Sequence, residues 1–290
     1  GHGRDKWPEL DVLRKYRQSV KELVSKLIFE LPLTLPIQKD SPMWIVLMGI
    51  EHERIHIETS LVLHRQMPLE LVKETEKFQI NQESGKAPKN SMIEIAASDI
   101  QLGVDDSHNL YSWDNEYGSY EECLPTFSAS KYLVSNGEFL KFVNDGGYSN
   151  LEYWDEEGLE FLEKTKAKCP HFWILKDGVY SYRTLNSEIE MPYDWPVDVN
   201  ALEAEAFCRY KSDKEGITYQ LPSESEYRAI YEYALLKDVP EFQSENANVD
   251  FAHYASSVPV NKFSFNGIYD VVGNVWQWSR TAIRSEERRV

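Results

Sequence analysis

Helical periodicity dominates the first eighty residues. Across residues 8–31 leucine and valine recur at steps of three and four, with Lys, Arg and Glu between them, a pattern that predicts an amphipathic helix. A second helix is predicted over residues 41–66, because Ser41 is a cap residue followed by Pro42 at the first helical position, and Pro68 lies just beyond its end. A third helical stretch is predicted over residues 69–78.

The pattern changes after residue 80. The run from Asn81 to Asn90 is polar and contains Gly, Pro and Ser, which indicates a linker. Beyond it aromatic residues are frequent and the apolar runs are short. We therefore expect an α+β protein with a partial helical bundle at residues 1–80, a linker at 81–92 and an irregular mixed domain at 93–290.

Local signals place further helices in the second domain. Ser135-Asn136-Gly137-Glu138 and Ser223-Glu224-Ser225-Glu226 each resemble a capping box, in which serine and glutamate bond each other's backbone amides. Another helix is predicted over about residues 200–211, and Gly146-Gly147 should end the helix that begins near Ser135. We expect Trp276 and Trp278 to be core residues, and Asp114-Asn115-Glu116 to form a turn rather than a cation site.

Composition narrows the class of protein. The chain has 290 residues, 42% hydrophobic and 27% charged, with a formal net charge of −17. That charge argues against nucleic acid and against an anionic membrane surface, and no apolar run approaches the roughly 20 residues that a spanning helix needs. The three cysteines form no CxxC pair, so a cytoplasmic location fits best. They are Cys123, Cys169 and Cys208.

Both ends of the sequence are unusual. The chain opens on Gly1-His2-Gly3 without an initiator methionine, and it closes on a charged run from Arg284 to Val290. We expect residues to be missing from both ends.

The segment from Glu51 to Glu58 carries the main chemical signal. On a helix, His52 and His56 are one turn apart and point the same way, so both imidazoles could bind one divalent metal ion. His52-Glu53-Arg54-Ile55-His56 also satisfies HExxH, with Glu53 as the general base of a zinc peptidase. The extended form of that motif fails, because Thr59 and Val62 stand where glycine and a third histidine are needed.

Two iron sites are alternatives to zinc. A di-iron bundle would need two Glu-x-x-His motifs, and the helical region holds one copy, Glu53 to His56. A mononuclear site would use His52 and His56, and we include Glu58 as a candidate ligand. Helix geometry turns Glu58 about 120° from His52 and about 160° from His56, so it is better placed to orient a neighbouring group. A third ligand should then come from elsewhere, and neither His2 nor His64 has a motif around it.

The stretch Gly49 to Ser60 resembles the iron-binding helix of the DinB-like domain in the 5-histidylcysteine sulfoxide synthases of ovothiol biosynthesis. The second half resembles the formylglycine-generating-enzyme, or sulfatase-modifying-factor, domain that follows it in that family. Four segments carry this second likeness, and they are Trp113–Gly118, Val134–Phe139, Leu221–Tyr227 and Asn266–Trp278.

The resemblance implies a fold and a reaction. The fold would be a partial DinB-like bundle followed by a mixed, C-type-lectin-like domain. The activity would be that of a non-haem Fe(II) oxygenase that joins cysteine sulfur to the histidine imidazole, with cysteine, histidine and O2 as its small-molecule partners. His52 and His56 carry over as ligands, whereas the family's third histidine, on an upstream helix, has no counterpart. An ergothioneine-type enzyme using trimethylhistidine, a zinc peptidase and a non-catalytic remnant remain alternatives.

Overall fold

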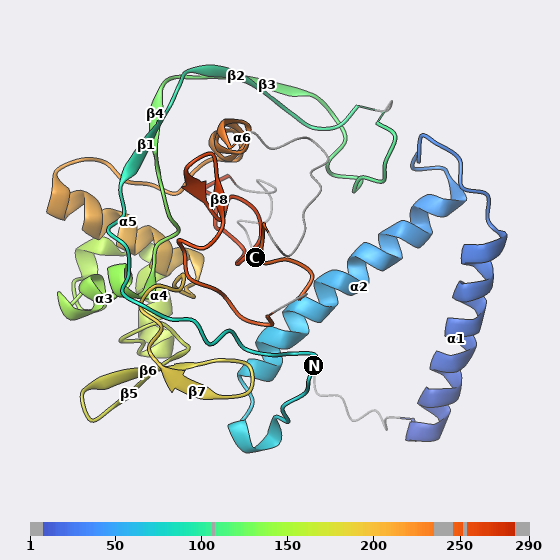
Figure 1. Cartoon of the computed structure of the whole chain (residues 1–290), viewed down its shortest axis with the longest axis horizontal. Coiled ribbons are helices and arrows are strands. Elements are labelled where there is room, and N and C mark those ends of the chain that lie inside the picture. The colour runs from blue at the N-terminus through green and yellow to red at the C-terminus, as the bar shows by residue number, and fades with distance from the viewer. Residues whose placement is uncertain (1–7, 106–107, 235–245, 252–253, 282–290) are drawn as a thin grey trace. The chain divides into compact units, whose positions relative to one another are not determined.

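A computed structural model describes residues 8–105, 108–234, 246–251 and 254–281 (Figure 1). His2 and the run from Arg284 to Val290 lie outside the described residues. The chain divides into two compact units, which are described separately. Unit 1 comprises residues 1–60 and 102–120, and unit 2 comprises residues 61–101 and 121–290. The domain boundaries expected from the sequence stay a prediction.

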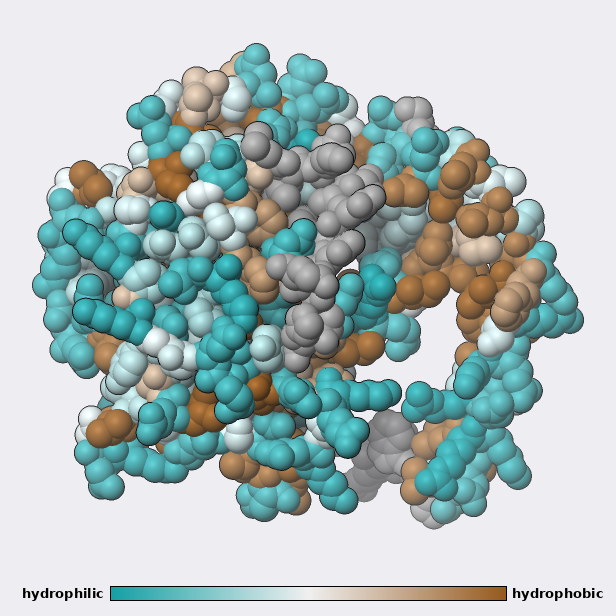
Figure 2. Space-filling view, in the orientation of Figure 1, coloured by the Kyte–Doolittle hydropathy of each residue, from teal (hydrophilic) through white to brown (hydrophobic). Residues whose placement is uncertain are grey.

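Two helices account for most of unit 1. The first two predicted helices are confirmed as α1 (Leu10–Glu30) and α2 (Pro42–Arg65), and the last turn of α2 belongs to unit 2. No residue of α1 is buried, and Met43 is the buried residue of α2. Figure 2 shows the hydrophobic residues that gather over these helices. Many apolar side chains of α1 are therefore left exposed within the described residues, whereas the first half of α2 is partly covered.

The third predicted helix is wrong in length. It is a single 3-10 turn, η1 (Leu69–Leu71), after which Val72 is extended and no helix follows up to Phe78. Helix nucleation is costly, so a short segment with few buried contacts does not stay helical. No residue of η1 is buried.

Short strands form the sheets. β1 (Met92–Ile95) pairs with β4 (Phe127–Ser130), and Met92 lies opposite Ser130. β2 (Ser98–Leu102) pairs with β3 (Tyr120–Leu124). A three-stranded sheet has the order β5 (Trp173–Lys176), β6 (Val179–Arg183), β7 (Glu188–Glu190). β8 (Ser264–Phe265) pairs with β9 (Ile268–Tyr269). The pairings of β1 with β4, of β6 with β5 and β7, and of β8 with β9 are antiparallel.

The described helices of unit 2 that follow β4 begin at side-chain caps. They are α3 (Asn136–Asn144), η2 (Leu151–Tyr153), α4 (Glu156–Thr165), α5 (Ala201–Glu215) and α6 (Glu224–Tyr233). α3 ends before Gly146, whose φ of +80° suits glycine. The mixture of short strands, helices and long loops confirms the predicted α+β class. No described helix is both long and apolar enough to cross a membrane.

The two predicted capping boxes differ. Ser223 and Glu226 form the complete box, with reciprocal bonds between side chains and backbone amides. Ser135 accepts from the amide of Glu138, but the Glu138 carboxylate binds Asn90 and Lys211 instead of bonding back. The prediction of a full box at Ser135 is wrong, because a cation from α5 competes for that carboxylate.

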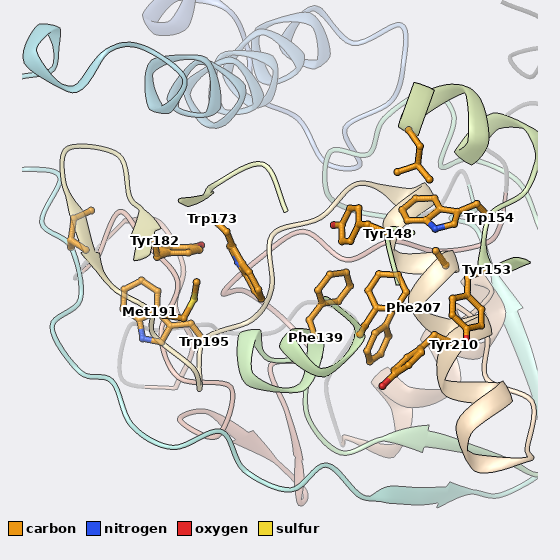
Figure 3. Close-up of a cluster of buried hydrophobic side chains, with 14 residues drawn as sticks. Phe139, Tyr148, Tyr153, Trp154, Trp173, Tyr182, Met191, Trp195, Phe207 and Tyr210 are labelled. Atoms are coloured by element: carbon orange, nitrogen blue, oxygen red, sulfur yellow. The ribbon is translucent and has the colours of Figure 1, made fainter. Parts of the chain in front are cut away.

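An aromatic core organises unit 2. Phe139 and Phe142 of α3 are fully buried, and the Phe139 ring stacks on Phe207 of α5 with centroids 5.2 Å apart. Figure 3 shows the rings of Phe139 and Phe207 between Trp173 and the group formed by Tyr153, Trp154 and Tyr210. Burying aromatic side chains of this size contributes much of a domain's hydrophobic stabilisation.

A second cluster packs α6 against the β8–β9 hairpin. Its buried members are Ala234, Ala247, Phe265, Ile268 and Val271. The expectation that Trp276 and Trp278 are core residues is wrong, because they are 73% and 50% exposed. Trp278 donates from its indole N–H to the carbonyl of Val199, so a backbone partner at the surface satisfies its polar edge.

Candidate metal centre

The two motif histidines lie on an unbroken helix. Residues 42–65 form one helix that begins at Pro42 and ends with His64 and Arg65, basic residues that suit the negative end of the helix dipole. Gly49 lies within it and has open space around its missing side chain. Because the helix continues through the motif, the spacing of four residues places both imidazoles on the same side.

His52 and His56 lie edge to face. Their ring centroids are 4.4 Å apart and the ring planes meet at 81°. Both side chains are exposed. Imidazole nitrogen suits iron(II) and zinc, so the pair fits as two donors of a divalent metal site.

Glu58 follows on the same helix, six residues after His52. In the part of the chain that the structure describes, no three His, Cys, Asp or Glu side chains are grouped so as to hold a metal ion. The assignment of His52, His56 and Glu58 as ligands therefore stays a prediction. Around the pair, Arg54 forms an ion pair with Glu51 at 3.6 Å.

A loop from the family-like region packs on the first half of α2 within unit 1. The indole N–H of Trp44 donates to the carbonyl of Ser112 at 3.0 Å, and its ring lies 5.5 Å from that of Tyr111. Tyr111 packs in turn against Trp113. The segment 102–120, which carries one of the four resemblance segments, therefore holds the start of the helix that bears His52.

Tyr111 is a half-buried residue whose hydroxyl oxygen is buried. Burial raises the pKa of the Tyr111 phenol, and the carboxylates of Glu116, Glu51 and Asp114 raise it further. Its hydroxyl oxygen has no hydrogen-bond partner. The phenol is thus held neutral among acidic groups.

The expected turn at Asp114-Asn115-Glu116 is confirmed. The carboxylate of Glu116 accepts from the amide of Trp113 at 2.7 Å, and the amide of Glu116 donates to the carbonyl of Trp113. These local bonds hold the Glu116 carboxylate in the turn.

The segment around Asn274 is held by side-chain bonds to backbone. Asn274 donates to the carbonyl of Val258 at 3.1 Å and accepts from its amide at 2.9 Å. It also donates to the Asp270 carboxylate at 3.1 Å. Gly273 has a φ of +81°, and an added Cβ would lie 2.8 Å from the carbonyl oxygen of Asn248, so this position needs glycine.

Asp270 is a buried acid that sequence reasoning missed. Burial raises the pKa of its carboxyl to about 7, although the bond from Asn274 works in the opposite direction. Its second oxygen, Oδ1, has no partner. Arg65 and Arg183 were missed as well. No periodicity marks any of these three residues, because their burial depends on segments distant in the sequence.

Comparison with known proteins shows a family match for most of the chain. Residues 77–289 match the family described as the sulfatase-modifying factor enzyme 1-like domain. The chain belongs to this family. Most of the matched residues lie in unit 2, which has a mixed α+β architecture. The family match does not cover the first helices, so it does not specifically support a DinB-like bundle.

The relatives of the chain include one protein named for hercynine and one named for ergothioneine biosynthesis. It is 26% identical over 196 residues to hercynine oxygenase of Mycobacterium tuberculosis, covering 63% of this chain and 44% of that protein. It is 22% identical over 316 residues to ergothioneine biosynthesis protein 1 of Schizosaccharomyces pombe, covering 98% of this chain and 36% of that protein. The chain thus spans less than half the length of these curated relatives. Among solved structures, PvdO from Pseudomonas aeruginosa matches with a TM-score of 0.43 and 18% identity, covering 68% of this chain and 73% of that one.

Proposed function

We propose that this chain carries the metal-binding helix and much of the family domain of an iron(II)- and O2-dependent sulfoxide synthase. The reaction joins the sulfur of cysteine to an imidazole carbon of a histidine. The observation that carries the proposal is the pair His52 and His56, one turn apart with rings 4.4 Å apart, on a helix in a member of this family. The match with ergothioneine biosynthesis protein 1 supports it further, because that match covers 98% of the chain.

In this proposal His52 and His56 hold the iron through their imidazole nitrogens. Bound iron(II) supplies thiolate binding and O2 activation, which amino-acid side chains alone do not provide. The helical backbone fixes the separation of the two rings before metal binds, so less side-chain freedom is lost on binding. Glu58 orients a neighbouring group instead of coordinating, because its position on the helix turns it away from both histidines.

The third ligand is left open by the proposal. The described residues hold no complete group of three metal-binding side chains. His64 lies at the end of α2, two turns beyond His56, and is too far along the helix to join the pair. His2 lies outside the described residues.

The acceptor imidazole has two candidates. The resemblance around residues 49–60 favours unmodified histidine, as in ovothiol biosynthesis. The relatives are named for hercynine, the trimethylated histidine, and for ergothioneine biosynthesis. Those names support trimethylhistidine at least as well, so both acceptors belong in the test. Cysteine and O2 are the other substrates, and a cytoplasmic location is part of the proposal.

Metal binding is tested by anaerobic titration of the purified chain with Fe(II). We expect one-to-one binding that is lost in His56→Ala and kept in His64→Ala, a histidine of the same helix outside the motif. Binding unchanged in His56→Ala, or absent from the unmodified chain, would contradict the proposal.

Turnover is tested with cysteine under O2, with histidine or trimethylhistidine as the acceptor. Mass spectrometry of the sulfoxide product then identifies the preferred acceptor. Zinc-dependent peptide cleavage that is abolished by Glu53→Gln would instead support the HExxH peptidase.

A further inference from the structure

Two arginines of unit 2 are interlocked. Arg65 Nε donates to the carbonyl oxygen of Arg183 at 2.6 Å, and Arg183 Nε donates to the carbonyl oxygen of Arg65 at 3.1 Å. These reciprocal bonds place the two side chains alongside each other at the end of α2 and the end of β6. Arg65 is 16% exposed in its side chain, and Arg183 is 8% exposed.

The two guanidinium groups have unequal partners. Arg65 forms an ion pair with Asp198 and lies over the Phe172 ring, 3.6 Å from its centroid. Arg183 donates from Nε and Nη2 to backbone carbonyls, the second being that of Met67 at 3.0 Å. Within the described residues no carboxylate forms an ion pair with Arg183.

The cluster therefore carries excess positive charge. Burial lowers the pKa of Arg183, and the neighbouring charge of Arg65 lowers it further. The Glu188 carboxylate acts in the opposite direction, but its oxygens bind Lys176 and Ser181. Asp198 also accepts a hydrogen bond from the Tyr182 hydroxyl at 2.8 Å, so its carboxylate is divided between Tyr182 and Arg65.

Each guanidinium also keeps one unused donor. Nη2 of Arg65 and Nη1 of Arg183 are buried and have no hydrogen-bond partner. Buried charged donors without a partner are costly, and native proteins leave few of them. A water molecule could accept these N–H bonds, but it would not neutralise the charge. An anion does both.

We propose that Arg65 and Arg183 form a binding site for one small carboxylate or oxyanion. Planar guanidinium N–H groups match the paired oxygens of a carboxylate, and the partly desolvated setting strengthens the pairing. Two sources supply this chemistry, namely the carboxylate of an amino-acid substrate and a free inorganic anion. The substrate alternative rests on the proposed function, whereas the anion site does not.

The test uses the metal-free chain, so it is independent of iron binding. Thermal unfolding and calorimetry are measured with sodium acetate and sodium phosphate at constant ionic strength, balanced with chloride. Two matched pairs follow, L-cysteine against cysteamine and L-histidine against histamine, in which the second member lacks the carboxylate. We expect saturable stabilisation by acetate or phosphate, or by the amino acids and not by the amines.

Variants locate the site. Arg183→Gln should weaken anion binding about tenfold or more, because it removes a charged donor. Arg209→Gln is the matched control, since Arg209 already pairs with Asp155 and Glu205. If Arg183→Gln does not fold, Arg183→Lys keeps the charge, loses the paired donors and should still weaken binding.

Each outcome of these experiments either supports the proposed anion site or overturns it. Stabilisation by cysteine or histidine but not by the matching amine supports a substrate carboxylate, and stabilisation by acetate or phosphate alone supports a free anion. No saturable effect from any anion overturns the proposal, as does wild-type affinity in the Arg183 variants. If the chain binds anions but does not bind iron, the result would contradict the proposed function and still support the anion site.

Discussion

Asn274 donates a hydrogen bond from Nδ2 to Oδ2 of Asp270 at 3.1 Å, whereas Oδ1 of Asp270 is buried and has no hydrogen-bond partner. A carboxylate in that setting is penalised by desolvation more than one hydrogen bond can offset. Burial accordingly raises the pKa of Asp270 to about 7.

The first prediction follows from that shift. The folded-state pKa lies above the ordinary aspartate pKa of 3.8, so the protonated form is favoured in the folded protein. Its stabilising contribution is complete below about pH 4 and is lost as the pH rises through about 7. Asp270→Asn, which cannot ionise, should therefore be more stable relative to wild type at pH 8 than at pH 5, by about 1–3 kcal/mol.

Urea unfolding of both proteins at the two pH values measures the difference. Asp250→Asn, at an exposed position, is the control for the loss of an aspartate charge. An equal effect of Asp270→Asn at pH 5 and pH 8 would mean that Asp270 titrates normally.

The second prediction concerns the metal ligands. His52→Ala should lower Fe(II) affinity by about tenfold or more, because it removes one of two imidazoles on the same side of α2. Glu58→Gln should change it by about threefold or less, since the helix turns this side chain away. Anaerobic Fe(II) titration measures both. A larger loss in Glu58→Gln than in His52→Ala would make Glu58 a ligand and refute the geometric argument.

The third prediction separates Glu138 from its expected capping role. Its Oε1 binds the ammonium of Lys211, and both side chains are largely buried. Glu138→Ala should cost about 1–3 kcal/mol, because Lys211 loses that partner in a partly desolvated site. Lys211→Met in the same chain should recover part of the loss.

A double-mutant cycle by urea unfolding measures the coupling between these two residues. The comparison is Ser135→Ala, which should cost about 1 kcal/mol through the helix cap alone. Strictly additive effects of the Glu138 and Lys211 substitutions would show that the ion pair contributes nothing.

The fourth prediction rests on the close approach of two glycines in unit 1. A Cβ at Gly103 would lie 2.3 Å from the carbonyl oxygen of Gly118, and the φ of Gly103 is +94°. Gly103→Ala should therefore destabilise the chain by more than about 2 kcal/mol, since backbone must move.

Gly178→Ala is the matched control for this substitution. It has a similar positive φ, +80°, but no atom within 4 Å of the added Cβ. It should cost about 1 kcal/mol from backbone strain alone. Thermal unfolding compares the two, and equal losses would exclude the proposed clash.

Local features of this protein were readable from the sequence alone. The extents of α1 and α2 follow from periodicity and proline, and the start of α6 follows from capping residues a few positions apart. The spacing that brings His52 and His56 together is likewise a property of any helix. Each of these depends on interactions within one or two turns.

Tertiary structure decided the rest. Glu138 prefers Lys211, which lies 73 residues away, to its own helix cap. Arg65 and Arg183 interlock across 118 residues, and Asp270 is buried by segments that no local pattern connects to it. Trp276 and Trp278 are exposed although their composition predicts burial. Burial and charge pairing depend on which distant segments meet, and the periodicity of a single segment carries no information about that.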